Sequence, residues 1–180
     1  MNTEVKTNTR TALILTVMRI VTWVAFIGLM IKAGAILISY GVSCVNPEAA
    51  RNLYMGLNLH TIRQINFWHY TLSVFFMIAL SGMKTFVLFL VIKALSKVNL
   101  VNPFTIGVAR ILEKISYVLL GTWVIVMLNN VHAGWLLKRT GILQEEWTTE
   151  EFIFMAGIVF IISQVFKRGV EIQSENDLTV

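Results

Sequence analysis

The sequence predicts an all-α, polytopic membrane protein built as a four-transmembrane-helix bundle, with short interfacial helices in its two long loops. Hydrophobic residues make up 56% of the 180 residues and charged residues only 14%, a composition far from that of soluble domains. The apolar residues are gathered in four long blocks. The polar stretches between them, of roughly 26, 22 and 11 residues, are too short to bury a core. We therefore expect a single membrane domain over residues 1–180.

The first three blocks are long enough to cross a bilayer on their own. A helix needs about 20 mostly apolar residues for this, because its backbone hydrogen bonds must close internally. The first predicted span covers about residues 11–42 and contains Arg19 and Lys32. The second covers 69–92 with one charge, Lys84, and the third covers 115–137 with none. Cleavage of the first block as a signal peptide is disfavoured, because its charged leader is long and the apolar run continues beyond the small residues at 33–35.

The fourth block, residues 152–166, needs its flanks in order to span, because it makes only about 22 Å of helix. The Thr-Thr-Glu-Glu sequence at 148–151 is a capping box that starts a helix near residue 148. At the other end, Lys167 and Arg168 can extend to the lipid headgroups. The fourth span is therefore predicted over 148–168. A re-entrant or surface-lying helix is the alternative.

The distribution of Lys and Arg predicts that both ends of the chain lie in the cytoplasm, since positive residues are retained there. With the N-terminus inside, nine basic residues lie on the inner side: Lys6, Arg10, Arg19, Lys93, Lys97, Arg110, Lys114, Lys167 and Arg168. Four lie on the outer side: Arg51, Arg63, Lys138 and Arg139. Three tryptophans fall at proposed outer ends, where aromatic rings favour the headgroup region: Trp68, Trp135 and Trp147.

Both long loops contain an Asn-Pro pair, which places a capping asparagine before a proline at the first helical position. Asn46-Pro47 predicts a short outer helix. Asn102-Pro103 predicts a partly polar helix on the inner surface that runs on into the third span.

The sequence carries none of the usual marks of catalysis or cofactor binding. Cys44 is the only cysteine, so no intramolecular disulfide and no cysteine-based metal cluster can form. His60 and His69 match no metal-ligand spacing, and there is no Gly-rich phosphate loop or nucleophile elbow. We therefore expect no enzyme activity, no catalytic or metal-binding residues and no cofactor. The basic residues are scattered among apolar spans, so we also expect no direct nucleic-acid binding.

A few polar side chains lie at membrane depth, where they are costly and are candidates for function. Lys32 and Lys84 have no acidic partner within the apolar parts of the spans. Asn129, Asn130 and His132 lie in the third span at about the depth of Lys32 on an antiparallel neighbour. These five residues form the candidate intramembrane polar site. Snorkelling of the lysines and hydrogen bonding of the amides to neighbouring helices are the alternatives.

Two short motifs resemble a bacterial family of four-span membrane proteins of unknown function (domain of unknown function 2975). The first is the F-[KR]-x-G helix end at 166–169 followed by the E-N-D-L-T-[VI] terminus at 175–180. The second is N-P-F-T at 102–105, just before the third span. The resemblance implies the four-span fold and a gene neighbourhood with a short helix-turn-helix regulator. It implies no catalytic residues.

Both motifs fall on the proposed inner side, which predicts a contact surface there. The candidate docking tail comprises Lys167, Arg168, Gly169, Glu171, Glu175, Asn176 and Asp177. The plainer alternative is that Gly169 ends or bends the helix and that the acidic tail is solvated. We expect a regulatory or interaction protein of the inner, cytoplasmic membrane that works with a small cytoplasmic helix-turn-helix regulator. A small transporter, channel or immunity-type protein using the outer polar residues is the alternative, and homo-oligomerisation stays open.

Overall fold

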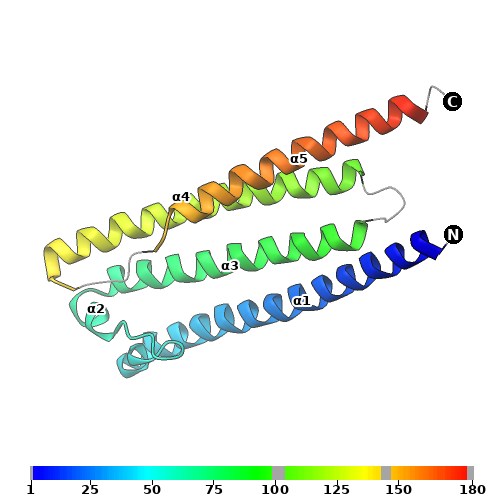
Figure 1. The fold of residues 1–180 in the computed structure, drawn as a ribbon. Coiled ribbons are helices and arrows are strands. Elements are labelled where there is room, and N and C mark those ends of the chain that lie inside the picture. The colour runs from blue at the N-terminus through cyan, green and yellow to red at the C-terminus, as the bar shows by residue number, and fades with distance from the viewer. Residues whose placement is uncertain (1, 99–103, 143–146, 178–180) are drawn as a thin grey trace. The chain divides into compact units, whose positions relative to one another are not determined.

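The chain folds entirely into helices and connecting segments in the parts that the computed structural model describes, which are residues 2–98, 104–142 and 147–177. The elements are α1 (Asn2–Val45), the 3-10 helix η1 (Pro47–Arg51), α2 (His60–Ile65), α3 (Phe67–Lys97), α4 (Ile106–Thr140) and α5 (Glu150–Asp177) (Figure 1). The predicted all-α class is confirmed.

Four of these helices are long and apolar enough to cross a membrane. The candidate spans within the described residues are Arg10–Val45, Phe67–Lys97, Ile106–Thr140 and Glu150–Glu175. Each exceeds the length of about 20 residues that a span requires. The protein is therefore a multi-pass membrane protein. The fourth helix starts at Glu150, close to the predicted capping box, and continues past the predicted end at residue 168.

The starts of the helices follow local capping chemistry. The side chain of Asn46 accepts a hydrogen bond from the Glu48 amide at 3.1 Å, with Pro47 at the first position of η1, as predicted. The other predicted pair, Asn102-Pro103, lies outside the described residues. Helix α4 is instead capped by Thr105, whose hydroxyl accepts from the Val108 amide at 3.3 Å. The partly polar segment predicted after the proline forms the first turns of α4 and continues into the span.

The chain divides into two compact units. Unit 1 comprises Met1–Phe26, Phe86–Leu120 and Phe152–Val180, and unit 2 comprises Ile27–Thr85 and Gly121–Glu151. In unit 1, Leu90 and Ala94 of α3 form a buried cluster with Ile111 and Ile115 of α4. Val159 of α5 packs against this cluster. The prediction of a single membrane domain stays a prediction.

In unit 2, the segment between α1 and α3 folds onto the helix ends. The buried core comprises Ile36, Ala50, Leu53, Leu59, Ile62, Tyr70, Val74 and Leu136. Residues of η1 and α2 therefore share one core with residues of α1, α3 and α4. The Asn66 side chain caps α3 by accepting from the Trp68 amide at 2.8 Å. This cap fixes the start of the helix that carries His69.

Candidate functional site

The two motifs that lie far apart in the sequence meet in unit 1. The Phe104 ring, just before α4, packs against the Phe166 ring of α5 with 5.2 Å between centroids. Gly169 lies one turn further along α5, and a Cβ atom there would lie 2.7 Å from Cδ1 of Phe104. Only a residue without a side chain allows this approach. Phe104, Glu113, Phe166, Lys167 and Gly169 are called the α4–α5 latch below.

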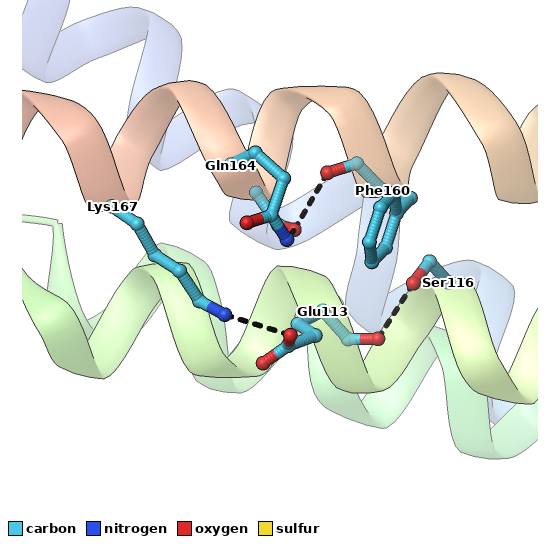
Figure 2. A network of polar contacts seen from close by, with 6 residues as sticks. Glu113, Ser116, Phe160, Gln164 and Lys167 are labelled. Atoms are coloured by element: carbon cyan, nitrogen blue, oxygen red, sulfur yellow. Dashed lines mark hydrogen bonds and ion pairs between the residues drawn. The ribbon is translucent and has the colours of Figure 1, made fainter.

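An ion pair completes the latch. Lys167 Nζ of α5 lies 2.7 Å from Oε1 of Glu113 on α4 (Figure 2). The two side chains are only 31% and 24% exposed. Coulombic attraction at such half-buried positions is screened less than between fully exposed charges. Glu113 is the only acidic residue in α4, so the pairing joins one specific point on α4 to α5.

The buried hydroxyls near the latch are satisfied within their own helices. Ser116 donates to the Glu113 carbonyl and Ser163 donates to the Phe160 carbonyl, each at 2.7 Å (Figure 2). Both serines are fully buried. Neither needs a partner on the opposite helix. Within the described part of unit 1, the charged contact between α4 and α5 is therefore made by Lys167 and Glu113.

The latch changes the predicted roles of three tail residues. Lys167 was expected to extend to the headgroups, but it pairs with Glu113. Arg168 is exposed and pairs with Glu171 at 2.7 Å along the same helix. The alternative was that Gly169 ends or bends the helix. Gly169 does not end it, because α5 continues to Asp177, and Gly169 lies against the Phe104 ring.

The remaining tail residues extend α5. Glu171 and Glu175 have exposed side chains. Asn176 and Asp177 belong to the helix, but their side chains lie outside the described residues.

In unit 2, two histidines from different helices form a pair. Nδ1 of His69 on α3 lies 3.3 Å from Nε2 of His132 on α4. The Trp135 ring lies 4.6 Å from the His69 ring and the Phe76 ring 6.0 Å from that of His132. The other ring nitrogen of His132, Nδ1, is buried without a hydrogen-bond partner among the described residues. One imidazole must donate to the other, because the two nitrogens share a single hydrogen bond.

The two asparagines beside this pair have different surroundings. The Asn130 side chain donates to the Trp147 carbonyl at 2.8 Å and accepts from the Trp147 amide at 3.1 Å. These two hydrogen bonds to the backbone of one residue fasten the segment before α5 to α4. Asn130 therefore fits the alternative in which the amides hydrogen-bond to neighbouring elements. Asn129 is buried and donates to Asn130 at 3.4 Å.

The candidate lysines lie on the surface of the spans. Lys32 on α1 and Lys84 on α3 both have exposed side chains. No hydrogen bond joins Lys32 to Asn129, Asn130 or His132 among the residues described. The structure thus brings His132 together with His69 and joins Asn129 to Asn130.

The histidines do not gather into a metal site in the described ranges. His60 lies 3.5 Å from a carboxylate oxygen of Glu48, whereas His69 contacts His132. No group of three or more His, Cys, Asp or Glu residues is placed to hold a metal ion in the part of the chain that the structure describes.

The sequence analysis did not predict the contacts that three residues of these sites make. Glu113 lies in the partly polar helix predicted after Pro103, and its pairing with Lys167 was not predicted. It is the only acid in α4, and Lys167 lies at the inner end of the fourth predicted span. Phe104 was recognised as part of a motif without a packing partner. The contact between His69 and His132 was not predicted, although antiparallel spans put the two residues at a similar depth.

Replacing Gly169 by alanine is expected to destabilise the protein by about 1–3 kcal/mol, because the new Cβ must displace the Phe104 ring. The free energy of unfolding in detergent measures the effect. Gly157→Ala on the same helix is the control. Nothing lies within 4 Å of a Cβ at Gly157, so this change should be neutral or stabilising, since alanine favours helix. Equal effects of the two substitutions would contradict the close packing of Phe104 on Gly169.

A double-mutant cycle with Lys167→Met and Glu113→Gln is expected to give a coupling free energy of about 1 kcal/mol, because the pair is half buried. The matched cycle with Arg168→Gln and Glu171→Gln should give less than about 0.5 kcal/mol, because those side chains are 65% and 58% exposed. The free energy of unfolding of each variant, measured by titration in mixed detergents, gives the coupling free energy of both cycles. A larger coupling for the exposed pair would argue against the latch.

Comparison with known proteins identifies a family without a known activity. The family model described as protein of unknown function (DUF2975) matches residues 46–180. The chain therefore belongs to this family, as its two motifs predicted. The match runs from η1 through α5 and includes the α4–α5 latch. No curated protein and no solved structure matches the chain.

Proposed function

We propose that this member of the DUF2975 family is a regulatory protein of the cytoplasmic membrane that holds a small basic regulator on the end of α5. The observation that carries the proposal is that α5 continues as a helix to Asp177 with Glu171 and Glu175 exposed on it. Residues four apart lie on one helical face. The end of α5 therefore offers a row of carboxylates on a regular backbone.

The chemistry of this face fits a basic partner. A helix-turn-helix regulator binds DNA phosphates with Lys and Arg side chains, and the same side chains can pair with carboxylates. The Arg168–Glu171 pair is exposed and contributes little to stability, so a partner's cation can replace Arg168 at small cost. A regulator held through its basic surface would be kept from DNA.

The latch supports the proposal by fixing the start of the tail. Phe104 packs against Phe166 and Gly169, and Glu113 holds Lys167. The carboxylates of Glu171 and Glu175 follow within the next two turns of the same helix. Their direction relative to α4 is thus set by the latch. The role needs no catalytic residue, and we propose that the protein is not an enzyme.

A second candidate function is transport by a small channel or carrier. The observation that favours it is the buried Nδ1 of His132, which has no hydrogen-bond partner among the described residues. Nearby polar groups are His69, which bonds to His132, and the buried Asn129. In this alternative the polar side chains of unit 2 would contact the transported species, and the tail would be dispensable.

Capture of a small helix-turn-helix regulator, of the kind that the family resemblance implies beside the gene, tests the docking role. The full chain with an N-terminal tag is co-expressed with the regulator and purified in detergent. With the variant Glu171→Lys/Glu175→Lys, the amount of regulator that co-purifies should fall by at least about tenfold. Two carboxylates that attract the basic regulator are replaced by ammonium groups that repel it. The control Glu150→Lys/Glu151→Lys makes the same charge change in the first turn of α5 and should retain the regulator.

Undiminished capture by the tail variant would contradict docking at the end of α5. The variant Asn129→Leu distinguishes the transport alternative from the docking proposal. Under the docking proposal, this variant should still capture the regulator. Loss of the cellular phenotype in Asn129→Leu, with an unaffected tail variant, would favour transport instead.

A further inference from the structure

Four exposed cations lie on two helices of unit 1. Lys93 and Lys97 are four residues apart and share one face of α3, and Arg110 and Lys114 share one face of α4 in the same way. All four side chains are exposed. No carboxylate forms an ion pair with any of them within the described ranges.

Two contacts show that these faces adjoin. Lys114 Nζ of α4 lies 5.5 Å from the centroid of the Phe86 ring on α3. Nearer the ends of the helices, Lys97 Nζ lies 3.8 Å from the position of a Cβ on Gly107. Phe86 lies two turns before Lys93, and Gly107 lies one turn before Arg110. The four cations therefore form one surface, called the α3–α4 cationic face below.

Glu113, the only acid on α4, is already engaged elsewhere because it pairs with Lys167. The cationic face thus concentrates like charges, which repel one another. An anion bound to this face would relieve the repulsion.

The apolar neighbours of the cations indicate which kind of anion fits. Phe86 and Phe89 are exposed by 40% and 45%, and their rings stack with 6.4 Å between centroids. They lie further from the end of α3 than Lys93 and Lys97, toward the middle of the span. Charge at the helix end and exposed aromatic rings further in match the headgroup and acyl chains of a phospholipid. A nucleic acid or an acidic protein would gain nothing from rings facing hydrocarbon.

We propose that the α3–α4 cationic face binds an anionic phospholipid, with the headgroup phosphates on Lys93, Lys97, Arg110 and Lys114 and the acyl chains along Phe86 and Phe89. Basic surfaces between membrane helices suit headgroups that carry more than one phosphate. Lys93 and Lys97 are about 6 Å apart along the helix axis, so the face can contact two phosphates. The site uses none of the residues of the docking tail and does not depend on the proposed function.

Lipid retention by the purified full chain tests the site. The purified protein in detergent is titrated with cardiolipin, which has two phosphates, or with zwitterionic phosphatidylcholine. Native mass spectrometry counts the lipid molecules bound to each chain. Lys97→Gln/Arg110→Gln should weaken cardiolipin binding by about 25-fold, at roughly fivefold per cation, and should leave phosphatidylcholine binding unchanged. Lys138→Gln/Arg139→Gln removes two cations at the other end of α4 and should change cardiolipin binding by less than about twofold.

Unchanged cardiolipin binding in the first variant, or an equal loss in the control, would overturn the proposal. Displacement of cardiolipin by millimolar inorganic phosphate would assign the face to a free anion and overturn the lipid assignment. Circular dichroism checks the helical content of each variant. If the double variant does not fold, the single changes Lys93→Gln and Lys97→Gln should each weaken binding roughly fivefold, and no loss in either would again overturn the site.

Discussion

Hydrogen bonding of the backbone in lipid is the constraint on which the rest of this structure depends. No water is present in the hydrocarbon to pair with exposed amides and carbonyls, so each crossing segment must close its bonds internally as a helix. This explains why most described residues between Arg10 and Glu175 belong to four long helices. It also explains why irregular backbone is found where polar caps such as Asn46, Asn66 and Thr105 satisfy the freed amides.

Once the spans are helices, burial of apolar surface no longer selects which helices pair, because lipid tails are as apolar as leucine. Specific contacts must come from close packing and from a few polar groups. The latch uses both, with Gly169 admitting the Phe104 ring and Glu113 pairing with Lys167. In unit 2, Asn130 makes such a specific polar contact, because its side chain holds the Trp147 backbone with two hydrogen bonds.

Local features of the fold could be predicted from the sequence, whereas contacts between distant residues could not. Hydropathy predicted the four spans, and the Asn46-Pro47 cap was predicted from two adjacent residues. The continuation of α5 past Gly169 was not predicted, because a glycine by itself favours a helix end. The ring that packs on Gly169 belongs to Phe104, which is distant in the sequence. The pairs His69–His132 and Glu113–Lys167 join residues 63 and 54 positions apart, and hydropathy carries no signal for such pairing.

The central claim is the proposed orientation of the spans, in which the latch and the candidate docking tail lie on the cytoplasmic side. Cys44 is the only cysteine, so Cys44→Ser gives a background in which Glu48→Cys, Ser96→Cys and Ser174→Cys are labelled singly. All three positions are exposed. A membrane-impermeant maleimide should label Glu48→Cys in intact cells, and Ser96→Cys and Ser174→Cys only after permeabilisation. Labelling of Ser174→Cys in intact cells would contradict the account.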